Sequence, residues 1–196
     1  MKAIAIIEDE HRAIAAVIQG LRHLVAEVGA GRMAADHKLL GAMFHYIEAF
    51  PEKLHHPKED DYLFARLRMR RPEVAPVLDA LEREHVAGRE RLAELKELWE
   101  RYQADPAAHS AFAEELERYA QFHWRHMRKE EDEVLPLAAQ ALTADDWAAI
   151  DAAFASNEDP IVGVPASKTF RELFTQIVTI APPPWGVGPE TKREPL

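Results

Sequence analysis

The chain is most constrained by heptad rows of apolar residues that histidines interrupt. In the first predicted helix, one row would be wholly aliphatic if it did not contain a single histidine, His11. Rows with this spacing pack against other helices, so His11 is expected to point into a helical core. The two rows are Ile4, His11, Ile18 and Val25, and Ile7, Ile14, Leu21 and Val28.

Two later predicted helices carry the same interruption. In the third helix one histidine lies in an apolar row, and in the fourth two histidines and two glutamates occupy the rows. Burying such groups without partners is costly, so the pattern predicts that something in the core satisfies them. The rows are Leu78, His85, Leu92, Trp99 and Leu81, Gly88, Leu95, Tyr102 in the third helix, and Phe112, Tyr119, His126, Glu133 and Leu116, His123, Glu130, Leu137 in the fourth.

The chain is expected to be all-α. Alanine, leucine, glutamate and arginine dominate, and four long helices with short turns predict an antiparallel up-down-up-down four-helix bundle with extra C-terminal helices. Residues 1–141 would form the bundle and residues 142–196 a C-terminal helical extension with a proline-rich tail. The expected helices cover about 3–29, 34–70 (kinked at Pro51 or Pro57), 72–102, 106–141, 143–156 and 166–180.

Composition limits the possible chemistry and partners. The chain has ten histidines and no cysteine, which leaves imidazole and carboxylate as its metal ligands. Its net charge of -10 disfavours nucleic acid and anionic membranes as partners. It has no apolar run near the roughly 20 residues of a membrane span and no apolar leader, so a cytoplasmic location is expected.

Two His-x-x-x-Glu pairs, His55/Glu59 and His126/Glu130, each place both side chains on one helix face. Helix rise tests whether they meet the other inward histidines. From the first turn of the bundle, His11 lies about 28 Å along its helix and His55 about 31 Å. From the second turn, Glu59 lies at about 17 Å and His85 at about 18 Å. From the third, His85 lies at about 27 Å and His126 at about 28 Å, so all six residues share one layer.

The remaining histidines are expected to differ in role. His123 lies in a seam one turn from His126 and is a candidate ligand or a partner of a ligand. His56 can approach the layer if the region of Pro57 distorts the helix. Their distances along the helices and their places outside the heptad rows predict that four others lie at the surface or in local hydrogen bonds: His23, His37, His45 and His109.

The donor set indicates a two-metal site. Imidazole suits iron, zinc, copper and nickel, whereas carboxylates suit hard or redox-active ions. Glutamates on two opposing helices can each bridge two ions, with histidines as terminal ligands. Iron is the expected metal, and zinc or manganese are the alternatives that such a ligand set also accepts.

Four segments carry a family resemblance: DEHRA at His11, LHHPKEDDYLF at His55, EREH at His85 and HWRHMRKEEDEVLPLA at His126. Over about residues 3–140 the chain resembles the haemerythrin family, specifically the bacterial HHE cation-binding domains. The resemblance implies a bundle that holds two irons joined by an oxo or hydroxo bridge. It also implies that Glu59 and Glu130 bridge the two irons and that His11, His55, His85 and His126 are terminal ligands.

One position departs from the oxygen-carrying haemerythrins, which place a second histidine four residues after the one in the third helix. Here that residue is Arg89. The site then has one imidazole fewer unless His123 or His56 substitutes, and an open coordination position suits a small diatomic ligand. We expect a protein that binds or senses O2, NO or iron, with a di-iron redox enzyme or an iron-donating repair protein as the alternative. A homodimer and a signalling interface formed by the C-terminal segment stay open.

Overall fold

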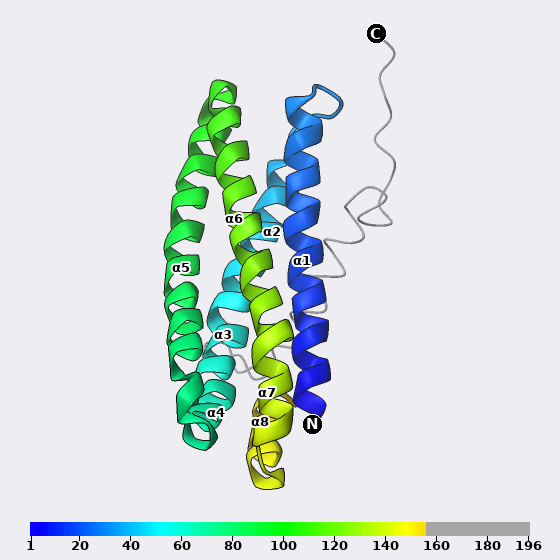
Figure 1. Cartoon of the computed structure of the whole chain (residues 1–196). Helices are drawn as coiled ribbons and strands as arrows, with labels where there is room; N and C mark the ends of the chain where they lie inside the picture. The colour runs from blue at the N-terminus through cyan, green and yellow to red at the C-terminus, as the bar shows by residue number, and fades with distance from the viewer. Residues whose placement is uncertain (156–196) are drawn as a thin grey trace.

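The computed structural model describes residues 1–155. Four long helical segments run up, down, up and down and pack in a ring, which confirms the predicted all-α antiparallel bundle (Figure 1). The first segment is α1 (Lys2–Gly29), and the second comprises α2 (His37–Ala49), η1 (Pro51–His55), α3 (His56–Lys58), η2 (Glu59–Phe64) and α4 (Ala65–Arg70). The third comprises η3 (Pro72–Val74) and α5 (Ala75–Ala104), and the fourth η4 (Pro106–Ala108), α6 (His109–Lys129), η5 (Glu130–Val134) and α7 (Leu135–Ala141).

Side-chain caps set where two of these segments begin. Asp105 accepts a hydrogen bond from the Ala107 N–H at 2.9 Å, so the fourth segment starts at the predicted Asp-Pro step. Asp36 accepts hydrogen bonds from the N–H groups of Lys38 and Leu39, both at 3.0 Å. This cap starts α2 at residue 37, two to three residues later than the sequence pattern predicts.

Three π-helical turns interrupt the second and fourth segments, whereas the sequence predicted only a kink in the second segment, at Pro51 or Pro57. The N–H groups of His56, Ala65 and Leu135 bond to carbonyls five residues earlier, as π turns require. Pro57 and Pro136 each follow a π turn by two residues. Because proline has no N–H for the carbonyl four residues earlier, it favours a local change of helical pattern.

The π turn η5 changes which residues of the fourth segment face the core. The heptad pattern placed Glu133 in a seam, and this prediction was wrong because Glu133 is exposed. Val134 and Leu135 are buried instead, while Leu137 is only half-buried. The extra residue that a π turn accommodates advances every later side chain around the helix axis, so a strict heptad reading fails beyond Glu130.

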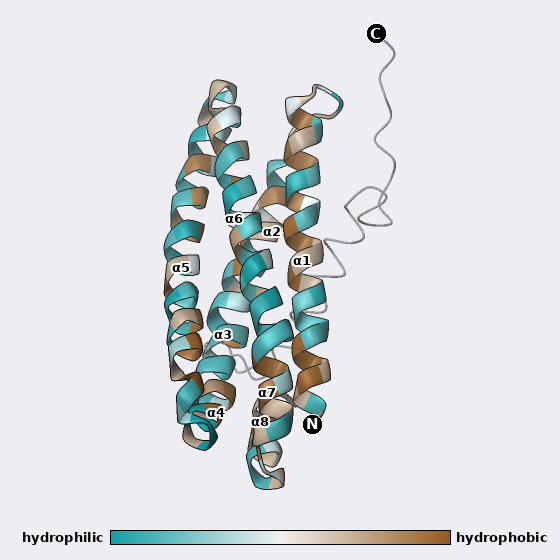
Figure 2. Cartoon of the chain, viewed as in Figure 1, coloured by the Kyte–Doolittle hydropathy of each residue, from teal (hydrophilic) through white to brown (hydrophobic). Residues whose placement is uncertain are grey.

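The core consists of two apolar clusters with a polar layer between them. The ribbon of α1 shows the division, because a hydrophilic stretch separates hydrophobic residues on either side of it (Figure 2). The upper cluster includes Ile14, Leu21, Phe44, Leu95 and Phe112, and the lower cluster includes Ile7, Phe64, Leu81, Val134 and Trp147. Six of the predicted metal ligands lie between the two clusters along their segments: His11, His55, Glu59, His85, His126 and Glu130.

A further helix, α8 (Ala144–Ala155), packs against the start of α1 where a short fifth helix was predicted. Its Asp151 accepts a hydrogen bond from the Ala3 N–H at 2.7 Å, and its Ile150 and Phe154 belong to the lower cluster. The helix predicted over 166–180 and the proline-rich tail lie outside the described residues. The division of the chain at residue 141 stays a prediction.

Among the described helices, none combines the length and the apolar character that a bilayer crossing requires. The cytoplasmic location and the lack of nucleic-acid and membrane partners stay predictions, as does the homodimer.

Candidate metal centre

Six of the predicted site residues converge in the polar layer. Each is at most 2% exposed, and together they come from all four segments of the bundle. The inner Nε2 atoms of His11 and His55 lie 3.1 Å apart, and those of His85 and His126 lie 3.0 Å apart. The six are His11 of α1, His55 of η1, Glu59 of η2, His85 of α5, His126 of α6 and Glu130 of η5.

Both glutamates reach both histidine pairs. Glu59 lies 3.8 Å from the His11 Nε2, through Oε1, and 3.6 Å from the His85 Nε2, through Oε2. Glu130 directs Oε2 to the His11 Nε2 at 3.4 Å and Oε1 to the His126 Nε2 at 3.3 Å. Each carboxylate therefore spans the space between the two imidazole pairs, as a bridging ligand would.

The outer nitrogen of each of these four histidines contacts a carboxylate from the preceding segment around the bundle. This arrangement fixes the ring orientation and, with the proton on Nδ1, leaves Nε2 free to bind a cation. The four contacts to Nδ1 form a closed ring: Glu10 to His55 at 2.8 Å, Asp60 to His85 at 2.8 Å, Glu84 to His126 at 3.0 Å and Glu131 to His11 at 2.8 Å.

Sequence reasoning missed these outer carboxylates, although a signal was present. Each one is adjacent in sequence to a predicted ligand, as Glu84 is to His85 and Glu131 is to Glu130. Their partners, however, lie on a neighbouring segment, so a helix-by-helix reading cannot pair them. The tertiary arrangement is needed to show that the four contacts form a ring.

The donor set fits metal cations. All four carboxylate oxygens of Glu59 and Glu130 are buried and lack a hydrogen-bond partner among the described residues. Buried charges of this kind need a counter-charge, and a cation would provide it. Two of the three groups whose ligand atoms lie within 4.8 Å of one another contain Glu59: His11, His55 and Glu59, and Glu59, His85, His126 and Glu130. Because Glu59 belongs to both groups, the geometry fits two neighbouring ions.

Without metal, protons on the histidines supply part of the positive charge that the buried carboxylates need. Burial lowers the pKa of the His85 imidazole, but the carboxylates of Asp60, Glu130 and Glu59 raise it more, to about 10. Burial likewise opposes protonation of His11, and its carboxylate neighbours hold its pKa well above the usual value. Burial raises the pKa of Glu130, and the neighbouring imidazoles outweigh this effect and hold the pKa well below its usual range.

The other histidines fall into two classes. His56 and His123 are buried, and burial lowers the pKa of His56 well below its usual value and that of His123 to about 3. The structure does not bring His123 into either ligand group described above. The remaining four lie outside the layer, as expected. His45 is exposed, His23 and His37 are half-buried, and the His109 Nε2 lies 2.9 Å from the carbonyl of Val25.

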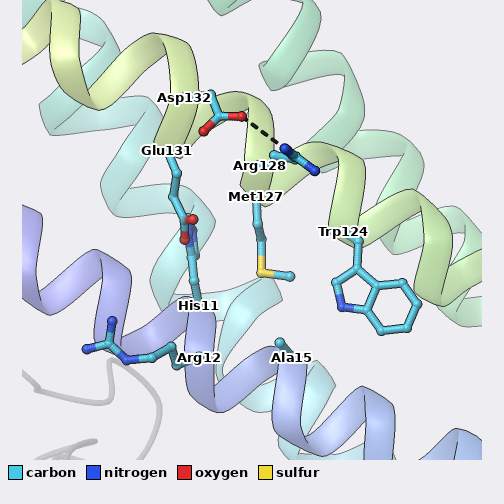
Figure 3. A pocket seen from close by; sticks show the side chains of 8 residues that line it. All are labelled: His11, Arg12, Ala15, Trp124, Met127, Arg128, Glu131 and Asp132. Atoms are coloured by element: carbon cyan, nitrogen blue, oxygen red, sulfur yellow. Dashed lines mark hydrogen bonds and ion pairs between the residues drawn. The ribbon is translucent and has the colours of Figure 1, made fainter.

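A surface pocket of about 470 Å³ lies beside the layer, between α1 and the fourth segment. The side chains of Glu131 and His11 point toward each other along its wall, with Met127 and Trp124 nearby (Figure 3). Glu131 is 41% exposed, whereas His11 is 2% exposed. Only the Glu131 carboxylate and the His11 ring thus separate the solvent in this pocket from the inner nitrogen of His11.

Comparison with known proteins identifies one family. The family model described as Hemerythrin HHE cation binding domain matches residues 2–138, which include all six converging residues. Comparison with curated proteins and with solved structures gives no significant match.

The outer carboxylates generate a first prediction. Glu84→Gln removes the charge that orients His126, and loss of such a partner typically weakens metal binding by about 10–100-fold. Glu82→Gln is the matched control, because Glu82 is exposed to a similar degree and pairs with Arg68 away from the layer. Competition with a chelator for Fe²⁺ measures both affinities. Equal affinities of the two variants would contradict a role for the ring.

A second prediction concerns the pH dependence of the metal-free protein. A group with a raised pKa in the folded state stabilises the fold below its unfolded pKa of about 6.5. That contribution is lost as the pH rises through the folded pKa, which is about 10 for His85. The Tm of chelator-treated protein should therefore fall between pH 6.5 and 10, with much less change in metal-loaded protein. A Tm of the metal-free form that is constant or rises over this range would refute the linkage.

Proposed function

Because the chain belongs to the haemerythrin HHE cation-binding family over residues 2–138, we propose that it is a non-haem di-iron protein. In this proposal the centre binds or senses a small diatomic ligand, O2 or NO, or responds to iron itself. The terminal ligands would be His11, His55, His85 and His126, and the bridging ligands Glu59 and Glu130. We leave His123 out of the set because it joins none of the three ligand groups.

One observation carries the proposal. Four imidazoles with carboxylate-bound Nδ1 atoms direct Nε2 toward two buried glutamates that have no other partner among the described residues. An ordinary polar core would satisfy those carboxylates with protein donors. The donor set instead suits a pair of cations, and two irons would supply the redox-active centre at which a diatomic ligand reacts.

The surroundings of the layer favour a small ligand. The upper and lower apolar clusters close the core on both sides, so a large substrate has no room beside the inner nitrogens. The pocket at Glu131 and His11 offers an approach from solvent. In this arrangement the outer carboxylates hold the imidazoles, while the apolar clusters limit the access of water.

The pocket also supports a second candidate, a redox enzyme or a protein that donates iron for repair. His11 is a proposed ligand and also lines the pocket, so an ion that it held would lie close to solvent. An ion in that position can be exchanged more easily than one enclosed on all sides. Fast exchange of iron would favour donation over a stable ligand-binding centre.

Metal analysis tests the proposal directly. Protein purified from an iron-supplied host should contain about two irons per chain, given the two converging ligand groups. His126→Ala should lose iron, whereas His45→Ala, which alters an exposed histidine, should keep it. Less than one iron per chain after anaerobic reconstitution with Fe²⁺ would contradict the proposal.

The same iron-loaded protein separates the two candidates. Mixing reduced protein with O2 or NO in a stopped-flow spectrometer should give an optical change that reverses when the gas is removed. Irreversible oxidation that becomes repeated turnover when an external reductant is added, or rapid transfer of iron to an acceptor chelator, would instead favour the enzyme or donor.

A further inference from the structure

The third segment supplies only one imidazole to the layer. Arg89 stands where oxygen-carrying haemerythrins have a second histidine, and its side chain is exposed. The pair His85 and His126 therefore lacks a third imidazole from α5. Another residue that reached the same place would complete this half of the centre.

His56, in the second segment, lies close to the His85 and His126 pair. His55 and His56 are consecutive, yet they are only 1% and 3% exposed. Neighbouring residues of a regular α-helix point about 100° apart, so one of the two would ordinarily turn away from the core. The π turn η1 ends between them and changes this relation, and π turns of this kind are frequent at functional sites.

The ring of His56 lies against both histidines of that half of the centre. It stacks on the His85 ring with centroids 4.3 Å apart and planes 13° apart, and its centroid is 5.5 Å from that of His126. One ligand atom from each of the three residues falls within 4.8 Å of the others. His56, His85 and His126 thus form a third group suited to hold an ion.

Glu52 gives His56 the same type of partner that the other four histidines have. The His56 Nδ1 lies 3.4 Å from the Glu52 Oε2, slightly farther than the 2.8–3.0 Å in the ring. Neither His56 Nδ1 nor either Glu52 oxygen has a hydrogen-bond partner among the described residues. These buried groups face each other, so a small shift would satisfy both and would fix the orientation of the imidazole.

We propose that His56 is a fifth imidazole ligand, bound to the ion that His85 and His126 hold and oriented by Glu52. This inference rests on the proposed di-iron function. The centre would then be asymmetric, with three imidazoles at one ion and two at the other, and His56 would replace the histidine that Arg89 displaces.

His123 provides a matched control. It is 1% exposed, and its ring lies parallel to that of His56 at a centroid distance of 6.2 Å. It belongs to no group of converging ligand atoms among the described residues, and no carboxylate contacts its Nε2. A substitution there disturbs the packing of the same region without removing a proposed ligand.

The test compares wild type, His56→Gln, Glu52→Gln and His123→Gln after anaerobic loading with ⁵⁷Fe²⁺. His56→Gln should release one of two irons to a competing chelator about 10–100-fold more readily, and Glu52→Gln about 10-fold more readily. His123→Gln should resemble wild type. Mössbauer spectra should show two unequal iron environments in wild type and a smaller difference between them in His56→Gln.

The outcomes separate the two proposals. If wild type holds less than one iron, the di-iron function fails and this inference fails with it. If wild type and His56→Gln hold two irons with the same release and the same spectra, only the role of His56 is overturned. Equal weakening by His123→Gln would also overturn it, because packing would then explain the effect. If His56→Gln does not fold by circular dichroism, Glu52→Gln decides, since it leaves the ring in place.

Discussion

The structure depends on a closed ring of contacts between carboxylates and imidazoles. Each segment of the bundle places an acidic side chain on the histidine of the next, from Glu10 to His55 and onward to Glu131 and His11. Rotation of any one segment about its axis would break two of these contacts, because each segment provides both a carboxylate and an imidazole. The ring therefore fixes the helical phases at the depth where the inner nitrogens meet, while the two apolar clusters stabilise the bundle on either side.

Helix period and rise were sufficient to predict the bundle, the inward histidines and their shared depth, because both are regular properties of α-helices. They failed where the backbone is irregular. The π turn η5 exposes Glu133 and buries Val134, and no heptad pattern encodes a hydrogen bond to the fifth preceding carbonyl. The outer carboxylates were missed because their partners lie on other segments. The inward position of His56 likewise depends on the π turn η1. Pro57 indicates that the helix is irregular there, but it does not predict a π turn.

Without metal, the stability of the protein should depend on the protons that the polar layer holds. Glu59 and Glu130 are buried without hydrogen-bond partners among the described residues, and the raised pKa of His11 and His85 reflects the negative charge around them. Because bound cations would replace these protons, metal binding and folding should be coupled. The same residues would thus form the site and make folding depend on metal or pH, because bound metal would offset the cost of burying the carboxylates.

An anomalous-difference map collected at the iron edge from a crystal of the iron-loaded protein tests the central claim most directly. Two peaks should lie in the polar layer between Glu59 and Glu130, one beside His11 and His55 and the other beside His85 and His126. A peak for the second iron next to the His56 ring would place the fifth imidazole as well. A single peak, or iron only outside this layer, would contradict a two-metal centre.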